Sequence, residues 1–315
     1  MGPYILIIYI LERYQVHILG CGSALPTVKH LPSSQVISLR NKLYMIDCGE
    51  GAQLQFRKSH LSFSSLHHIF ISHLHGDHCF GLPGLISTLA LLGRKSDLHI
   101  YAPEALESLL SPWLEYFCKG ISFQVVFHPI NTQIKVKIYE DNALSVTTLP
   151  LRHRIPCCGF LFEENAALPH IRRDMIDYLN IPHFEINRIK KGGDWTTTDG
   201  RIFKHEQLVI PAAQPRKYAY CSDTAYHPTL IDSLSRINLL FHEATFAQSE
   251  QARAAETFHS TAMQAASIAR DANVKKLIIG HFSARYQDEQ ILLKEAKEVF
   301  PQTILAQEKL SIDID

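Results

Sequence analysis

A group of potential metal ligands occupies residues 73–78, which read His-Leu-His-Gly-Asp-His. The group directly follows the apolar residues 69–71, a short run that is typical of a buried β-strand. Side chains at positions i and i+2 of an extended segment point the same way. His73 and His75 can therefore bind one cation together.

The same group continues with Gly76, Asp77 and His78, and the small glycine allows the chain to turn. The last two side chains then face a second point close to the first. Two-metal hydrolytic sites hold their ions about 3.5–4 Å apart, so the spacing favours a binuclear centre. The alternative is a chance cluster in a chain with 18 histidines among 315 residues, and the complete pattern makes that alternative much weaker.

Three further candidate ligands, His153, Asp223 and His281, follow apolar strands elsewhere in the chain. Each lies at or near the turn that ends its strand, where a ligand at a sheet edge is expected. A single histidine in such a place is more often a core or surface residue. Together with residues 73–78, however, the three complete a ligand set large enough for two cations.

The chemistry of these side chains suggests how they divide between the cations. We expect the first cation to be bound by His73, His75 and His153. We expect the second to be bound by Asp77, His78 and His281, with Asp223 bridging the pair. Nitrogen and carboxylate ligands without thiolate favour Zn²⁺, with Mn²⁺ or iron as alternatives. A hydroxide held between two such ions is a strong nucleophile at neutral pH, and Asp77 could orient it and accept its proton.

The composition is that of an ordinary globular protein, with 46% hydrophobic and 20% charged residues. The 31 basic and 31 acidic side chains balance, so a polyanionic substrate must be bound by a local basic patch. The seven cysteines are an odd number without a Cys-x-x-Cys pair, which favours a reducing cytoplasm. We expect all seven to be buried structural thiols, although Cys21 and Cys221 could lie near the metals.

The first twelve residues include an apolar run at 4–11. This run is much shorter than the roughly 20 residues of a membrane-spanning helix, and it lacks the basic start and cleavage site of a signal peptide. We therefore expect no membrane segment here. The run predicts either an extra strand or a start codon placed too far upstream.

Apolar runs alternate with amphipathic stretches along most of the chain. Strands are predicted at 15–19, 34–40, 42–47, 67–71, 99–102, 218–220, 239–241 and 277–279, and helices at 52–59, 82–92, 105–117, 261–271 and 288–300. Residues 121–150 alternate apolar and polar side chains, which indicates further β-sheet. This order predicts a layered α/β domain with its site at one set of strand ends. Residues 164–212 differ in composition and are predicted to leave the core.

Several stretches carry a likeness to a known family. They are 19–27 (LGCGSALPT), 47–53 (DCGEGAQ), 72–85 (SHLHGDHCFGLPGL), 242–246 (HEATF), 259–261 (HST) and 280–286 (GHFSARY). With the ligands named above, they resemble the metallo-β-lactamase superfamily and, within it, the ribonuclease Z family in its short form. The likeness covers nearly the whole chain.

This resemblance implies one metallo-β-lactamase domain over residues 1–315, built as a four-layered αββα sandwich. Residues 164–212 would be a protruding flexible arm, inserted in that domain, that binds tRNA. The resemblance further implies a cytoplasmic homodimer with two Zn²⁺ ions in each chain. The implied activity is endonucleolytic removal of the 3′ trailer from precursor tRNA, which leaves a 3′-hydroxyl on the tRNA.

The resemblance also singles out Glu243 and His259, which belong to the motifs at 242–246 and 259–261. A histidine held by a carboxylate stays protonated more readily, so His259 would donate a proton to the phosphate or to the leaving 3′-oxygen. The alternative is that His242 and Glu243 only support the metal ligands. We favour catalysis for Glu243 and His259, and a supporting role for His242.

Contacts with tRNA are expected from Arg285 in the last motif and from Arg188, Lys190 and Lys191 in the arm. Residues 170–217 carry nine Lys and Arg against six Asp and Glu, an excess that suits phosphate contacts but also an ordinary solvated surface. The sequence departs from the family pattern at two places. Residues 28–32 (VKHLP) replace an Arg-Asn pair, and the arm lacks a Gly-Pro motif.

Two other functions stay open at this point. A small-substrate hydrolase of the same fold, such as a phosphodiesterase, arylsulfatase, lactonase or thioesterase, would use the same metals. The pair Glu243 and His259 and the long insertion favour the nuclease. A metal-binding protein without catalysis would be expected to lack a ligand or the general base, and neither is missing. A β-lactamase is disfavoured, because Asp223 stands where those enzymes commonly carry a cysteine.

Overall fold

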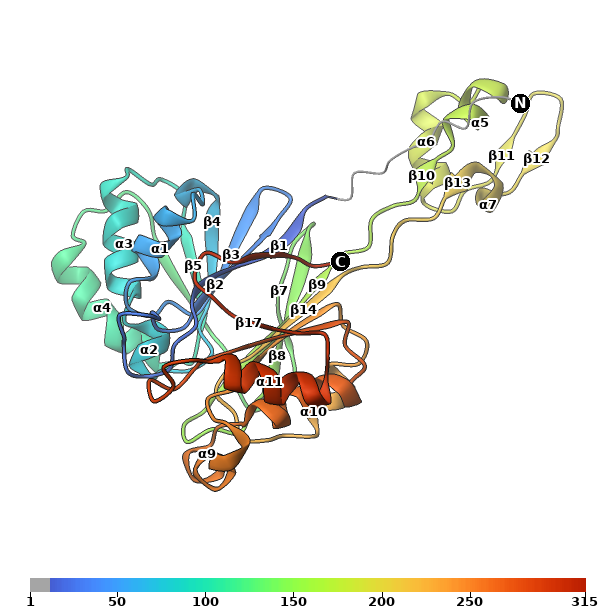
Figure 1. Ribbon diagram of the computed structural model, residues 1–315. Coiled ribbons are helices and arrows are strands. Elements are labelled where there is room, and N and C mark those ends of the chain that lie inside the picture. Colours follow the sequence, from blue (N-terminus) through green and yellow to red (C-terminus); the bar gives the residue numbers. More distant parts are fainter. Residues whose placement is uncertain (1–11) are drawn as a thin grey trace. The chain divides into compact units, whose positions relative to one another are not determined.

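The computed structural model describes residues 12–315, which form two compact units. Two β-sheets form the centre of the first unit, which comprises the described residues up to Phe162 together with Lys217–Asp315 (Figure 1). The first sheet has the strand order β18 (Ser311–Asp313), β1 (Tyr14–Gly20), β2 (Ser34–Leu39), β3 (Lys42–Ile46), β4 (Leu66–Phe70), β5 (Leu98–Ala102) and β6 (Val125–Pro129). The second has the order β17 (Thr303–Leu305), β16 (Lys276–Gly280), β15 (Leu239–Glu243), β14 (Lys217–Cys221), β9 (Cys158–Glu164), β8 (Leu144–Pro150) and β7 (Lys137–Glu140).

The two sheets pack against each other, and helices cover their outer faces. Buried side chains from both sheets share one core, in which the rings of Phe70 and Phe160 lie 5.7 Å apart. The first sheet is covered by α1 (Ala52–Lys58), α3 (Leu82–Leu91) and α4 (Ala105–Phe117), and the second by α8 (Leu230–Ser233), α10 (Ala262–Asp271) and α11 (Gln290–Val299). This arrangement confirms the predicted four-layered αββα sandwich.

Short helices lie in the loops between these elements. They are α2 (Gly76–Cys79), α9 (Gln251–Thr257) and the 3₁₀ helices at Phe63–Ser65 and Gln248–Glu250. None of the helices in the described residues is long and apolar enough to cross a membrane. The extra strand expected near the amino terminus falls in residues 1–11, outside the described part of the chain.

Parallel pairing brings the chemically interesting loops together. β4 pairs in parallel with β3 and β5, and β15 pairs in parallel with β14 and β16. Ligand sites in such sheets lie beyond the carboxyl ends of the strands. The loops that follow β4, β14, β15 and β16 carry His73, Asp223, Thr245 and His281 respectively.

The β-structure predicted for residues 121–150 is divided between the two sheets. β6 pairs in parallel with β5 in the first sheet, whereas β7 pairs in antiparallel fashion with β8 in the second. Alternation of apolar and polar side chains indicates a strand but not its partner. The sequence pattern therefore located these strands without assigning them to their sheets.

A second compact unit comprises Glu163–Arg216. It contains α5 (Arg173–Tyr178), α6 (His183–Lys190) and α7 (His205–Leu208), with the strand pairs β10 (His170–Ile171) with β13 (Val209–Ile210) and β11 (Trp195–Thr196) with β12 (Ile202–Phe203). Its own core consists of Leu179, Ile181, Ile189, Leu208 and Val209. The segment therefore buries apolar residues of its own.

Candidate metal centre

Four side chains from three loops converge on a first point. His75 Nδ1 lies 3.0 Å from His73 Nε2 and 3.1 Å from His153 Nε2. Asp223 Oδ2 lies 3.7 Å from the Nε2 atoms of both His73 and His153. These atoms are close enough together to hold one ion.

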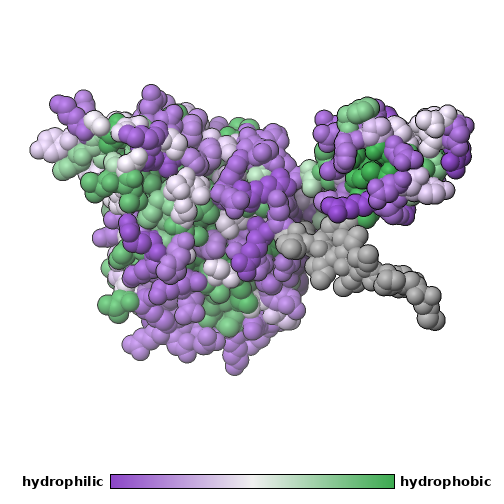
Figure 2. Space-filling model, turned by 90° about the horizontal axis from the view of Figure 1, so that it is seen from above, coloured by the Kyte–Doolittle hydropathy of each residue, from purple (hydrophilic) through white to green (hydrophobic). Residues whose placement is uncertain are grey.

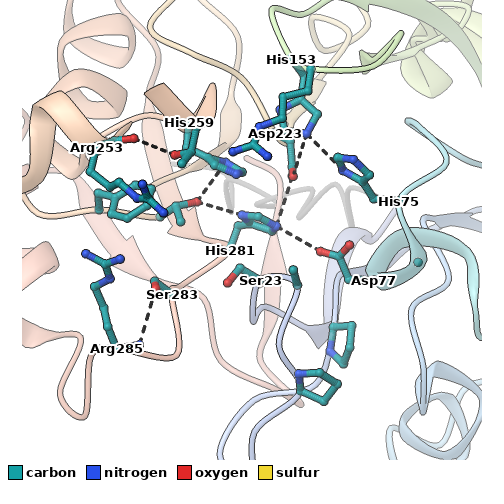
Figure 3. Close-up of a pocket in the computed structure, with 18 of the residues that line it drawn as sticks. Ser23, His75, Asp77, His153, Asp223, Arg253, His259, His281, Ser283 and Arg285 are labelled. Carbon is teal, nitrogen blue, oxygen red and sulfur yellow. Dashed lines mark hydrogen bonds and ion pairs between the residues drawn. The ribbon is translucent and has the colours of Figure 1, made fainter. Parts of the chain in front are cut away.

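A second group lies directly beside the first. Asp77 Oδ2 is 3.3 Å from His78 Nε2 and 3.5 Å from His281 Nε2. Asp223 Oδ1 is 3.3 Å from His78 Nε2 and 3.2 Å from His281 Nε2. The two oxygens of the Asp223 carboxylate thus face the two groups separately, which is the arrangement expected of a bridging ligand (Figure 3).

Five of the candidate ligands are histidines. In four of them, the ring nitrogen that faces away from the centre makes a hydrogen bond, which holds the ring in a defined orientation. His78 Nδ1 lies 2.7 Å from Asp47 Oδ2, and His153 Nδ1 lies 3.1 Å from the Phe258 carbonyl oxygen. Because these oxygens only accept hydrogen bonds, the Nδ1 atoms must donate. The Nε2 atoms of both rings then carry lone pairs that point to the centre, as metal-binding histidines require.

The same logic applies to His73 and His281. Ser72 Oγ donates to Asp47 Oδ2 and lies 3.0 Å from His73 Nδ1. Thr245 Oγ1 donates to Glu243 Oε2 and lies 2.9 Å from His281 Nδ1. Each hydroxyl has given its only proton to a carboxylate, so it accepts from the histidine Nδ1, and Nε2 again faces the centre as a lone pair.

This donor set fits divalent cations. Four Nε2 lone pairs, one Nδ1 atom and two carboxylates meet in a region where His73, His78, Asp223 and His281 are almost completely buried. The Nε2 atoms of His78 and His281 are buried and have no hydrogen-bond partner. Unpaired buried polar atoms are costly, and bound cations would satisfy them.

Electrostatics favour the metal-binding forms of two of the candidate ligands, Asp223 and His73. Burial raises the pKa of Asp223, but the surrounding imidazoles of His281, His78 and His73 outweigh burial and hold that pKa well below its usual range. Burial lowers the pKa of His73 well below its usual value, and His78 lowers it further. A carboxylate that stays ionised and an imidazole that stays neutral are the forms that bind metal.

Asp47 is the main support of the centre, and it is fully buried. Besides His78, it accepts hydrogen bonds from the Ser72 amide at 2.8 Å and the Tyr220 hydroxyl at 2.8 Å. Its φ of 52° is in the left-handed region, which costs a non-glycine residue energy and is common at functional sites. In the turn that follows, a Cβ added to Gly49 would lie 2.5 Å from the Asp77 carbonyl oxygen, so only glycine allows this close packing.

Glu243 and His259 form a pair next to the centre. Glu243 is fully buried at the end of β15, and its Oε1 lies 2.8 Å from His259 Nδ1. Burial lowers the pKa of His259, but the charge of Glu243 and its hydrogen bond outweigh burial and raise that pKa to about 9. The His259 ring stacks on the ring of His281 at 5.4 Å.

The local sequence around His259 explains its fixed position. Thr261 caps α10, because its side chain accepts a hydrogen bond from the Gln264 amide while the Gln264 side chain accepts one from the Thr261 amide. Ser260 Oγ donates to the Thr224 carbonyl oxygen at 2.7 Å, next to Asp223. His242, in contrast, has Nδ1 2.7 Å from the Glu243 carbonyl oxygen, and alternation along β15 places its side chain on the opposite face from Glu243.

A cavity of about 660 Å³ opens on the centre and on His259 (Figure 3). Three arginines, Arg154, Arg253 and Arg285, line it and supply positive charge. Arg285 pairs with Glu250 at 2.7 Å and lies over the Phe246 ring at 4.8 Å. The chain is neutral overall, and the three arginines bring local positive charge to a cavity that Glu50 also lines.

Several of these residues were not found from the sequence as site residues. Arg154 and Arg253 look like ordinary surface arginines, although the position of Arg154 directly after His153 was a usable signal. Thr245 lies within the HEATF motif but carries no chemistry of its own. Asp47 stood in a motif of the family likeness, and only the tertiary contact with His78 reveals its role.

The predicted tRNA contacts in the second unit lie on or next to α6. Arg188 is exposed, pairs with Glu185 and donates to the Asp194 carbonyl oxygen at 2.9 Å. Lys190 and Lys191 make no ion pair within the described residues. The basic excess counted over 170–217 disappears at the observed limits of the unit, because Lys217 drops out and Glu163 and Glu164 enter, which leaves eight residues of each sign.

Solved structures with the same architecture define the class of protein. The metallo-beta-lactamase fold protein YhfI from Bacillus subtilis is 17% identical, with a TM-score of 0.68, and the match covers 96% of this chain and 100% of that one. Human tRNase Z, short form, is 26% identical, with a TM-score of 0.69 and coverage of 96% and 99%. The chain therefore has the metallo-β-lactamase fold, which implies use of divalent metal.

Sequence comparisons then identify the family. Ribonuclease Z of Bacteroides fragilis strain YCH46 is 60% identical over 304 residues, which covers 96% of this chain and 100% of that protein. The family model of the anti-Pycsar protein Apyc1 also matches residues 14–169. The chain belongs to the ribonuclease Z family, which confirms the resemblance found from its motifs.

Proposed function

We propose that this protein is a zinc-dependent endoribonuclease that removes the 3′ trailer from precursor tRNA and leaves a 3′-hydroxyl on the tRNA. The observation that carries the proposal is the pair Glu243 and His259, because the His259 side chain lines the same cavity as Asp223. A proton donor beside a binuclear centre is the equipment that phosphodiester hydrolysis needs. Family membership and the arginine-lined cavity support an RNA substrate.

The metal ligands proposed are those named from the sequence, namely His73, His75 and His153 for one cation and Asp77, His78 and His281 for the other, with Asp223 shared. The set contains only nitrogen and oxygen donors, which suit Zn²⁺. Bound there, two cations would supply a hydroxide nucleophile at neutral pH. Asp77 orients the attacking water and accepts its proton.

His259 performs the complementary proton transfer. Its raised pKa keeps it protonated at neutral pH, so it can donate to the 3′-oxygen as the bond between that oxygen and phosphorus breaks. Glu243 stabilises the imidazolium and orients the ring through Nδ1. The arginines of the cavity bind the negatively charged phosphate and the flanking backbone.

We propose that the second unit, predicted as the arm at 164–212, binds tRNA away from the cleaved bond. Phe184, Arg188 and Lys191 are spaced four and three residues apart, so they share one exposed side of α6 and its end. An exposed aromatic ring with cations beside it is suited to nucleic acid. Lys190 adds a further charge.

We also propose a cytoplasmic homodimer. The apolar side chains of Leu91, Leu109, Tyr116 and Phe117 are between 63% and 87% exposed on α3 and α4, and Figure 2 shows apolar side chains on that side of the first unit. Such a patch is more often an interface than bare surface. All seven cysteines are unpaired, as expected in a reducing compartment.

Cleavage of an end-labelled precursor tRNA, with the cut mapped to the nucleotide, tests the proposed function. We expect one cut at the 3′ junction, with a 3′-hydroxyl on the tRNA fragment. Activity only on a chromogenic phosphodiester would assign the protein to the small-substrate hydrolases instead. Loss of both activities on chelation, and their return with Zn²⁺, would support metal dependence.

A further inference from the structure

A second cluster of potential metal ligands lies outside the binuclear centre. Cys21 follows β1, His30 lies in the loop before β2, and Glu308 lies between β17 and β18. Cys21 is 1% exposed, and the side chains of His30 and Glu308 are each 11% exposed. Two distant segments of the chain, the loop between β1 and β2 and the loop between β17 and β18, thus bring a thiol, an imidazole and a carboxylate together in a nearly buried place.

Two of the three distances between these atoms match the edges of a zinc coordination tetrahedron, and the distance from sulfur to nitrogen is somewhat shorter. With ordinary bond lengths, tetrahedral zinc places sulfur about 3.6 Å from nitrogen or oxygen ligands, and nitrogen about 3.3 Å from oxygen. Cys21 Sγ is 3.3 Å from His30 Nδ1 and 3.6 Å from Glu308 Oε1. His30 Nδ1 is 3.3 Å from Glu308 Oε1.

The far side of the His30 ring has the support that a metal-binding histidine usually has. His30 Nε2 lies 3.1 Å from Glu289 Oε1, so this nitrogen donates to a carboxylate. Glu289 is itself paired with Lys29. A carboxylate on the outer nitrogen orients the ring and strengthens the inner nitrogen as a ligand.

A positive charge is required between His30 and Glu308. With Nε2 bound to Glu289, the Nδ1 atom faces both oxygens of the Glu308 carboxylate, at 3.0 and 3.3 Å. Either a proton on Nδ1 or a cation must separate these atoms, because two lone pairs would repel. With a proton on Nδ1, the buried Cys21 thiol donates only long hydrogen bonds, at 3.6 Å to the Ala306 carbonyl oxygen and to Glu308 Oε1, whereas a cation would bind all three side chains.

The cluster is linked to the binuclear centre through backbone hydrogen bonds. The Phe282 amide donates to the Cys21 carbonyl oxygen at 3.0 Å, and the Ser23 amide donates to the Phe282 carbonyl oxygen at 3.1 Å. Phe282 directly follows His281, whose φ of 60° needs support from its surroundings. An ion at Cys21 would therefore brace the loop that presents a ligand of the centre.

We propose that Cys21, His30 and Glu308 form a third, structural metal site that binds Zn²⁺ and fixes the loop of His281. The thiolate is formed by loss of the Cys21 proton to solvent when the ion binds. The site would stabilise the fold rather than take part in cleavage. It is independent of the substrate proposed above.

Cobalt provides a direct test, because a cobalt–thiolate bond gives a near-ultraviolet charge-transfer band and the binuclear centre has no thiolate among its candidate ligands. We expect the full-length protein, reconstituted with Co²⁺, to bind a third equivalent and to show this band. Two equivalents without the band would overturn the proposal and leave a proton on His30. The wild-type measurement decides even if a variant fails to fold.

Single substitutions show which cysteine gives rise to the cobalt–thiolate band. Cys21→Ser should lose the band and one equivalent of metal, whereas Cys118→Ser, which removes a buried thiol on the far side of the first sheet, should keep both. Asp223→Asn should keep the band while losing metal from the binuclear centre. A band that persists in Cys21→Ser, or disappears in Asp223→Asn, would contradict the assignment.

Discussion

The Oε1 atom of Glu243 lies 2.8 Å from the Nδ1 atom of His259, and Glu243 has no exposed surface. The remaining bonds of the carboxylate are also occupied, because it accepts from the amides of Thr224 and Thr245 and from the Thr245 hydroxyl. The hydrogen bonds thus fix the Glu243 carboxylate, and the only partly exposed member of the pair is the His259 ring, which lines the cavity.

Replacement of His259 by alanine should slow cleavage without removing metal. General acid catalysis contributes about 10²- to 10⁴-fold, so we expect kcat for precursor tRNA to fall by that factor while KM changes little. Metal content, measured on the same preparation, should stay at the wild-type value. An alanine variant that keeps both its metals and its full rate would exclude His259 as the proton donor.

The pH dependence of kcat should show the ionisation of His259 and its dependence on Glu243. His259 has its pKa raised to about 9, so it is protonated and active below that value and loses its proton above it. Cations bound nearby would lower the pKa, and we therefore expect the alkaline limb of kcat at or below pH 9. Glu243→Gln removes the charge that raises the pKa, and the limb should move to lower pH. If the alkaline limb of the Glu243→Gln variant stays at the wild-type pH, the ionisation that it reports belongs to a group other than His259.

Asp47 should control metal affinity without touching the metal. Asp47→Asn keeps the size of the side chain but weakens its hold on His78 Nδ1. Loss of such a supporting carboxylate typically costs about 10- to 100-fold in metal affinity, which competition with a chelator would measure.

A matched control for Asp47 is Asp141→Asn. Asp141 is a largely buried carboxylate that accepts from Lys42 and from the hydroxyls of Tyr44 and Tyr139, away from the centre. This variant should lose stability but not metal affinity. Equal loss of metal affinity in both variants would indicate a general effect on folding.

Charge removal in the second unit should affect binding of tRNA alone. The double variant Lys190→Ala, Lys191→Ala removes two cations that make no ion pair within the described residues. We expect KM for precursor tRNA to rise and its dependence on log salt to weaken by roughly one for each cation that contacts phosphate. A small chromogenic phosphodiester should be cleaved at the wild-type rate, and equal loss on both substrates would argue against a remote binding role.

The sequence predicted which side chains would converge, because His153, Asp223 and His281 each come just after an apolar strand. Asp223 and His281 follow β14 and β16, which both run parallel to β15, and parallel strands deliver their carboxyl ends to one edge. The helix predicted at 105–117 coincides with α4. Where periodicity and strand ends determine position, local pattern was sufficient.

Other features depend on contacts between distant residues. Asp47 meets His78 across 31 positions, and nothing in its own neighbourhood reveals that contact. β9 begins at Cys158, the second of two adjacent cysteines, has no clear alternation of apolar and polar residues, and was not predicted. Arg154 and Arg253 became part of the site only when their loops met at the cavity. Pairing across long separations is the information that one sequence pattern does not carry.

Anomalous diffraction at the zinc absorption edge, from crystals grown with Zn²⁺, tests the central claim most directly. We predict two peaks that flank the Asp223 carboxylate, one among His73, His75 and His153 and the other among Asp77, His78 and His281, separate from the peak proposed at Cys21. Fewer than two peaks in contact with Asp223 would contradict a bridged pair of metals and the mechanism built on it.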